Sequence, residues 1–101
     1  MSDDLEIENA INEKGLNAPR VNIETIEQVI KNKQFYIFPD SCFTVCLLSL
    51  KNGFNVSGES ACVSAENFDK ELGEKIAFEN AKDKIWQLEG YLLKEELFNQ
   101  R

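Results

Sequence analysis

The 101-residue sequence contains no histidine. Histidine is the side chain that most often acts as a general base near neutral pH, and it is a common zinc ligand. Its absence excludes Ser-His-Asp and Cys-His catalytic groups and most zinc sites. We therefore expect a protein that is not an enzyme, with no catalytic residue, no metal site and no cofactor.

Long apolar runs are also missing. The longest, Phe43–Leu50, has the length of a strand, whereas a helix that crosses a bilayer needs about 20 apolar residues. Residues 1–6 lack the basic and apolar regions of a signal peptide. These two absences predict a cytoplasmic protein that does not bind membranes.

Basic residues are few: 11 Lys and Arg stand against 18 Asp and Glu, which gives a net charge of −7. A nonspecific grip on phosphate backbones needs clustered Lys and Arg, so direct nucleic-acid binding is not expected. The acidic excess lies at residues 1–32 and 66–101, while residues 33–65 hold two residues of each sign. An acidic helical exterior around an apolar sheet is therefore predicted.

Cysteine occurs three times, at Cys42, Cys46 and Cys62, without a CxxC pair. On a strand, Cys42 and Cys46 would lie about 13 Å apart on one face, which is beyond the reach of a disulfide. An odd number of cysteines in a chain without an export signal favours reduced, partly buried thiols. A reactive thiol or an intermolecular bond remains the alternative.

The length is sufficient for one domain, which we assign to residues 1–101. Residues 1–15 are expected to contain a loosely attached helix, over 3–14, that ends at Gly15. A second helix is predicted over Ile23–Lys31, with Asn22 as its N-cap. Its isoleucines at 23, 26 and 30 share one face, so this helix is expected to dock on another element.

Three strands are predicted next, at Gln34–Phe38, Phe43–Leu50 and Phe54–Glu59. Asn52-Gly53 between two apolar runs is a strong hairpin signal, because both residues tolerate a positive φ. The middle run is apolar at odd and even positions, so we expect a central strand with both of its faces covered. Together these patterns predict a small antiparallel sheet.

A long helix is expected after Ser64, its predicted N-cap, with a break at Gly90. Its apolar stripe comprises Phe68, Leu72, Ile76, Ala77, Ala81, Ile85, Leu88 and Leu92. Gly73 and Ala77 would permit a close approach to the sheet or to a second chain. The predicted class is α+β: a small three-stranded antiparallel sheet packed against a long C-terminal helix, with one or two short N-terminal helices. One face of such a sheet remains to be covered, either by those helices or by a second copy of the chain, so a homo-oligomer is one of two alternatives.

Several segments, in order along most of the chain, resemble a known family. They are Gly15–Val21, Phe43–Cys46, Leu50–Phe54, Gly58–Val63, Asn67–Asp69, Gly73, Ala77, Glu79–Ala81, Lys84–Trp86 and Leu88–Leu93. The family consists of small proteins of tailed bacteriophages and prophages, called after the phage gene 49 and gene 66 products. Ser64-Ala65 departs from the Asp-Pro expected there, but Ser64 still fits a helix start. The resemblance implies a phage-encoded accessory protein in the host cytoplasm, and it supplies no catalytic residue.

Ten residues are candidates for binding, each with a structural alternative. They are Arg20, Gly58, Glu59, Ser60, Lys75, Glu79, Asn80, Lys84, Trp86 and Tyr91. The structural interpretation makes Gly58 a bend that leaves the sheet and makes Trp86 and Tyr91 closing residues of the core. It also makes Arg20 a bridge between helices. Like-charged Glu79 and Asp83 would be balanced by Lys75, four residues before Glu79, or by a divalent cation that lacks an evident third ligand.

We expect the protein to bind a host protein and inhibit it. Antiviral defence and nucleic-acid machinery are the predicted targets, because an acidic exterior complements a basic nucleic-acid-binding groove. The alternative is an oligomer that sequesters a signalling nucleotide at subunit junctions. That site would use Arg20, Lys75, Lys84 and the backbone around Gly58.

Overall fold

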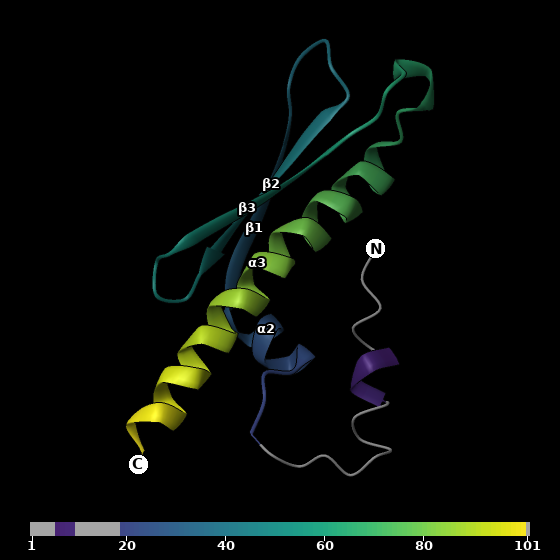
Figure 1. The fold of residues 1–101 in the computed structure, drawn as a ribbon. Helices are drawn as coiled ribbons and strands as arrows, with labels where there is room; N and C mark the ends of the chain where they lie inside the picture. Colours follow the sequence, from purple (N-terminus) through teal and green to yellow (C-terminus); the bar gives the residue numbers. More distant parts are fainter. Residues whose placement is uncertain (1–5, 10–18, 101) are drawn as a thin grey trace.

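The computed structural model describes residues 6–9 and 19–100 (Figure 1). In chain order its elements are α2 (Ile23–Val29), β1 (Ile30–Ile37), β2 (Phe43–Leu50), β3 (Asn55–Ala61), the 3-10 helix η1 (Ala65–Asn67) and α3 (Lys70–Asn99). The predicted α+β architecture is confirmed: a three-stranded antiparallel sheet, a long C-terminal helix and a short N-terminal helix. None of the described helices is both long and apolar enough to span a bilayer.

The strand order is β1-β2-β3, which makes β2 central as predicted. The hairpin between β2 and β3 forms at the predicted Asn-Gly pair. Gly53 adopts φ 93°, and the Asn52 side chain accepts a hydrogen bond of 3.0 Å from the amide of Phe54. This turn fixes the register, in which Leu48 lies opposite Val56 and Cys46 lies opposite Gly58.

The first helix of this part of the chain ends earlier than expected. Asn22 caps α2 as predicted, accepting a hydrogen bond from the amide of Thr25. The helix was expected to reach Lys31, but it ends at Val29, and Ile30 begins β1 opposite Leu50. The prediction was wrong because pairing with β2 extends the backbone at this β-branched residue, which overrides a weak helical preference.

The start of the long helix also differs from the prediction. Ser64 caps only the short η1, whereas Asp69 caps α3 and accepts a hydrogen bond of 3.0 Å from the amide of Leu72. The helix then continues for 30 residues without the break expected at Gly90. A single helical glycine costs about 1 kcal/mol, and the strong helix formers around it offset that cost.

Helix α3 crosses one side of the sheet at very short range. Ala77, Ala81 and Ile85 are fully buried against it. Gly58 makes the approach possible: a Cβ there would lie 2.3 Å from the amide nitrogen of Ala81. Gly58 therefore lies within β3, opposite Cys46, and the bend predicted at this glycine is wrong. Gly73 also contacts the sheet closely, as predicted, since its Cβ would lie 3.2 Å from the Thr44 hydroxyl oxygen.

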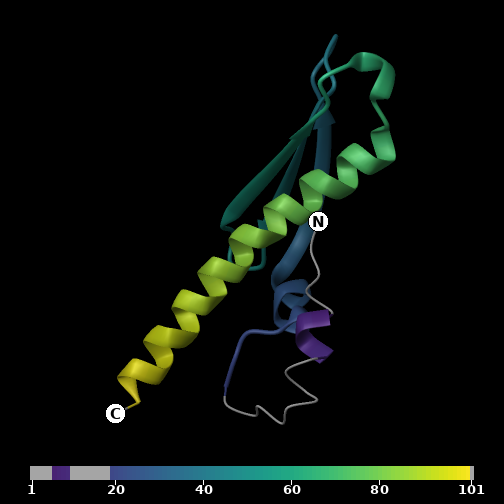
Figure 2. The ribbon, with the colours of Figure 1, turned by 45° about the vertical axis from the view of Figure 1, so that its right-hand side comes forward.

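Only one face of the sheet is covered by the described residues (Figures 1 and 2). Along β2, Thr44, Cys46, Leu48 and Leu50 are buried beneath α3, whereas Phe43 and Leu47 are exposed. Helix α2 does not cover the other face, because its Ile26 side chain packs into the core on the same side of the sheet as α3. The expectation that both faces of this strand are covered is wrong.

Most of the helix predicted over residues 3–14 lies outside the described residues. Residues 6–9 form one helical turn. The guanidinium of Arg20, just before α2, forms a salt bridge with the carboxylate of Glu8 in this turn. The bridge predicted for Arg20 is confirmed.

Candidate functional site

Three aromatic side chains form a cluster at the hairpin end of the uncovered sheet face. Phe38 follows β1 and lies opposite Phe43, with its amide 3.2 Å from the Phe43 carbonyl oxygen. Alternation along β1 places Tyr36 on the same face, so the ring centroids of Tyr36 and Phe38 are 4.9 Å apart and those of Phe38 and Phe43 are 5.8 Å apart. The three rings nevertheless remain 56, 46 and 38% exposed, respectively.

The rest of this face has little charge. We call it the open face: Asn32, Gln34, Tyr36, Phe38, Phe43, Val45, Leu47, Ser49, Asn55, Ser57, Glu59 and Ala61, as the strand register places them. Glu59 is the one ionised side chain in this set. Apolar side chains with neutral polar neighbours resemble the centre of a protein interface, where charged residues are depleted and aromatic residues enriched.

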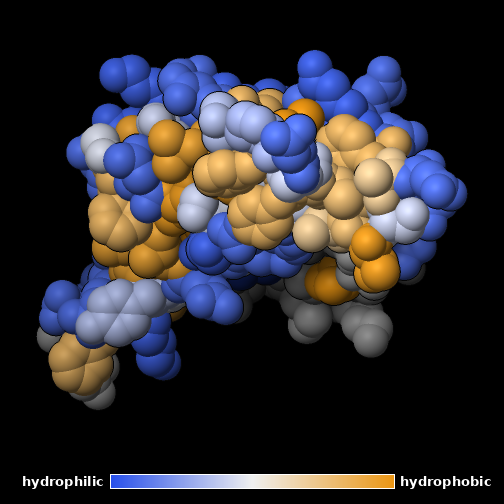
Figure 3. Space-filling view, turned by 90° about the horizontal axis from the view of Figure 1, so that it is seen from above, coloured by the Kyte–Doolittle hydropathy of each residue, from blue (hydrophilic) through white to orange (hydrophobic). Residues whose placement is uncertain are grey.

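Figure 3 looks onto the end of the molecule that carries the β1–β2 hairpin. Apolar side chains form a band across this view, with hydrophilic side chains along its upper and right-hand edges and below its centre. Exposed contiguous apolar surface is uncommon on proteins that act alone in water. The open face is therefore our candidate binding surface.

Three of the predicted site residues lie in a row on β3, where they hold α3 in place. The Ser60 hydroxyl donates a hydrogen bond of 2.7 Å to the carbonyl oxygen of Gly73. The Asn80 side chain donates one of 2.8 Å to the carbonyl oxygen of Glu59, on the outer edge of the sheet. Gly58 is covered by α3. The structure thus brings Gly58, Glu59, Ser60 and Asn80 together, as a seam between helix and sheet.

The balance of charge near Glu79 differs from the prediction. The Glu79 carboxylate pairs with Lys82 at 3.0 Å, three residues later, instead of with Lys75. Lys82 also lies over the Phe78 ring, 4.7 Å from its centroid, which holds the ammonium next to Glu79. Lys75 is exposed. Within the part of the chain that the structure describes, no group of acidic and thiol side chains is arranged to hold a metal ion.

The remaining candidates are dispersed. Trp86 packs against the core, as predicted, but Tyr91 is 68% exposed and does not close it. Lys84 lines a groove beside β3. Arg20 lies in a different groove with Glu89 and Glu96, whose negative charges disfavour a phosphate. A single chain does not bring together the residues of the predicted nucleotide site, because α3 covers the backbone at Gly58.

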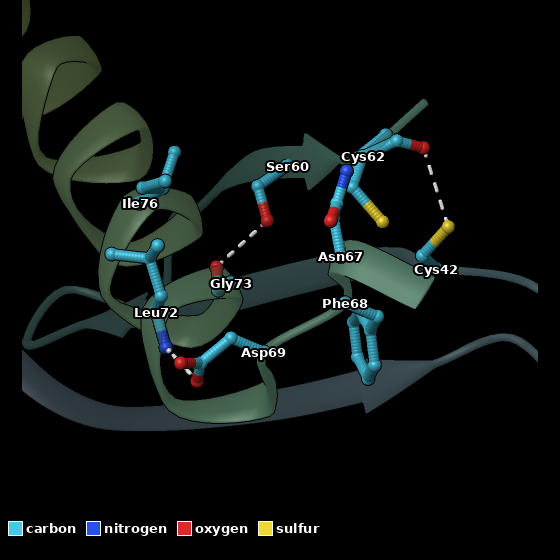
Figure 4. Close-up of a pocket in the computed structure, with 10 residues that line it drawn as sticks. Cys42, Ser60, Cys62, Asn67, Phe68, Asp69, Leu72, Gly73 and Ile76 are labelled. Carbon is cyan, nitrogen blue, oxygen red and sulfur yellow. Dashed lines mark hydrogen bonds between the residues drawn. The ribbon is translucent and has the colours of Figure 1, made fainter. Parts of the chain in front are cut away.

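A small cavity lies between the end of β3 and the first turn of α3 (Figure 4). Its volume is 70 Å³, far below the roughly 300–1,000 Å³ typical of small-molecule sites. Ser60 and Asp69 point toward it, but both are already hydrogen-bonded to the start of α3. Cys42 and Cys62 lie at one end of the cavity, where contact with the Cys42 thiol and burial raise the pKa of Cys62. The cavity suits water and small reagents.

The comparisons with known proteins give a family and nothing closer. The family described as "Phage protein (N4 Gp49/phage Sf6 gene 66)" matches residues 21–97. The chain belongs to this phage protein family. The matched range runs from the start of α2 to near the end of α3, so it contains the whole sheet and the seam. No curated protein and no solved structure matches the chain.

Sequence reasoning about this phage protein missed the three aromatic residues of the open face as candidates. Tyr36, Phe38 and Phe43 carry a readable signal, since two aromatics two positions apart share a face of a strand and the 39–41 turn returns the chain opposite them. It also missed the proximity of Cys42 and Cys62. These two are equidistant from Asn52, so the register of the predicted hairpin already places them opposite each other.

Proposed function

We propose that this phage protein is a non-enzymatic accessory protein that binds a host protein through the open face and inhibits it. The observation that carries the proposal is the cluster of Tyr36, Phe38 and Phe43, in which the Phe38 ring contacts the other two and all three stay exposed on an uncovered sheet face. Aromatic side chains dominate the energetics of protein interfaces because they bury a large area at low entropic cost.

The composition supports binding over chemistry. The whole sequence lacks histidine, which removes the usual means of activating a serine or a thiol near pH 7. The fully buried thiol, Cys46, has its pKa raised by desolvation, so it is a poor nucleophile. Blocking a host protein requires only that a surface be occupied.

Charge indicates the class of partner. The net charge is −7, yet the open face carries only one ionised residue, Glu59. The acidic residues of the rest of the molecule would attract a basic partner over long range, while the aromatic cluster would supply the contact itself. A host protein with an apolar patch beside a basic, nucleic-acid-binding surface fits this arrangement.

The test removes the rings and keeps the fold. We expect the double variant Tyr36→Ser, Phe38→Ser to lose about a thousandfold in affinity for the captured host protein, because interface aromatics contribute about 2 kcal/mol or more each. The tagged protein is purified from host lysate at low salt, and the captured protein is then assayed for its own activity with and without the purified phage protein.

The matched control is Phe54→Ser. Phe54 is 54% exposed, similar to Tyr36, but lies opposite Leu50 at the other hairpin, next to α3. This variant should capture and inhibit the host protein as the wild type does. Equal capture by the double variant, or capture without inhibition, would contradict the proposal.

A further inference from the structure

Cys42 and Cys62 lie across from each other at the end of the β2–β3 ladder. The last ladder pair is Phe43 with Ala61, so the next position along each strand is occupied by a cysteine. Opposite residues of an antiparallel pair have Cα atoms about 4.5–5.5 Å apart. Disulfides usually span about 4.4–6.8 Å between Cα atoms. Continued one position past the ladder, the spacing of opposite residues falls within the range that a disulfide spans.

The two thiols already interact with the same short segment. Cys42 Sγ donates to the carbonyl oxygen of Cys62 at 3.2 Å, and Cys62 Sγ donates to the carbonyl oxygen of Ser64 at 3.1 Å. Figure 4 shows the two cysteines side by side, with a dashed line for the first bond. Both are half-buried and line the small cavity, so neither thiol is enclosed in the core.

The third thiol differs in every respect. Cys46 is fully buried beneath α3, and it lies four residues after Cys42, which precedes β2, about 13 Å away along the extended chain. Cys46 is therefore too distant and too deeply buried to form a disulfide with Cys42 in place of Cys62. The chain thus contains one thiol pair that can be bridged and one internal control.

We propose that Cys42 and Cys62 form a reversible oxidation site that closes to an intramolecular disulfide in thiol–disulfide exchange with a low-molecular-weight disulfide such as oxidised glutathione. In the first step, the Cys42 thiolate attacks one sulfur of the oxidised glutathione, and one glutathione thiolate leaves. In the second step, the Cys62 thiolate attacks Cys42 Sγ and displaces the second glutathione thiolate. The two protons lost by the protein thiols pass to the departing thiolates or to water, so one disulfide is reduced as another forms.

The same bridge forms whichever of the two thiols attacks first, because each is a hydrogen-bonded, half-buried donor at the same end of the ladder. The bridge would tie β2 directly to the segment that leads through η1 into α3. It would also remove both sulfur donors from the carbonyl oxygens of Cys62 and Ser64.

The experiment is treatment of the purified full-length protein with oxidised glutathione, followed by intact mass measurement and a peptide map without reductant. The expected result is a monomer lighter by about 2 Da, the mass of two hydrogens, and a linked peptide that joins Cys42 to Cys62. Dithiothreitol should reverse both changes. The melting temperature should rise on oxidation by about 10 °C, because the closed loop restricts the unfolded chain.

Three variants sharpen the result. Cys46→Ala should form the same disulfide, while Cys42→Ser and Cys62→Ser should stop at a glutathione adduct. A bond that includes Cys46, covalent dimers, or an unchanged mass of the wild type would overturn the proposal. If a serine variant fails to fold, the peptide map of the wild type decides the matter alone.

Discussion

The two faces of the same three strands differ in the size and exposure of their side chains. On the covered face, Thr44, Cys46 and Leu48 of β2 are completely buried beneath the alanines of α3. On the open face, the neighbouring residues Phe43 and Leu47 are 38 and 36% exposed. One strand therefore presents alternately a packed surface and an unpartnered one.

The covered face owes its tight packing to small residues. The residues that face each other here have small side chains or none: Gly58 on β3, and Ala77 and Ala81 on α3. The backbones of β3 and α3 therefore come within contact distance of each other. The open face instead carries the rings of Tyr36 and Phe38, too large and too exposed to serve the core. The first face contributes to stability, and the second is the surface on which the proposed function depends.

The largest effect expected from this contrast is at Gly58. In Gly58→Ala, the new Cβ would lie 2.3 Å from the amide nitrogen of Ala81 and 2.4 Å from the carbonyl oxygen of Ala77, so α3 must move away from β3. We expect the free energy of unfolding to fall by about 3 kcal/mol or more, at the upper end of overpacking effects. Urea denaturation measures the loss.

The control for this substitution is Gly90→Ala on the same helix. A Cβ at Gly90 meets no atom within 4 Å, so the variant should gain up to about 1 kcal/mol from helix propensity. A tolerated Gly58→Ala would mean that the covered face is not closely packed at this point. The two faces would then differ in their amino-acid composition but not in how closely their side chains are packed.

The next effect is the difference in stability loss expected between two adjacent leucines that point to opposite faces. Leu48 is fully buried, so Leu48→Ala should lower the free energy of unfolding by about 2–5 kcal/mol. Leu47 is 36% exposed, so Leu47→Ala should cost about 1 kcal/mol, in proportion to the smaller area it buries. Thermal and urea denaturation of the pair give the difference directly. Equal losses would show that another surface covers the open face in solution.

Much of this contrast is readable in the sequence, because it depends on local chemistry. Asn52-Gly53 predicts the hairpin, and its register then assigns every residue of β2 and β3 to a face. The family resemblance, stated on segments spread over most of the chain, is confirmed by the match to residues 21–97.

The features of the fold that could not be predicted from the sequence depend on tertiary contacts. The run Phe43–Leu50 is apolar at both odd and even positions, which does not reveal that only one side has a cover. The seam has the same origin: Asn80 meets the carbonyl oxygen of Glu59, 21 residues earlier, only because Gly58 lets α3 lie against β3. Composition likewise does not show that Ile30 pairs with Leu50 and ends α2.

The smallest effect tests whether the covered face is optimal. The Thr44 hydroxyl is buried there without a hydrogen-bond partner among the described residues. Replacing it by a methyl in Thr44→Val removes this desolvation cost and keeps the branched shape that suits a strand. We expect a gain of about 1 kcal/mol, or a rise in melting temperature of about 5 °C.

Thr25→Val is the matched control, because the Thr25 hydroxyl donates a hydrogen bond of 3.0 Å to the N-cap Asn22, so its removal should lower stability. Opposite signs for the two threonines would confirm that the covered face gains its stability from apolar packing. A loss of stability in Thr44→Val would instead assign the buried hydroxyl a polar partner near Gly73, whose Cβ position lies 3.2 Å from the Thr44 hydroxyl oxygen. The covered face would then include a polar contact of its own, and the distinction between a purely apolar covered face and the more polar open face would no longer hold at this position.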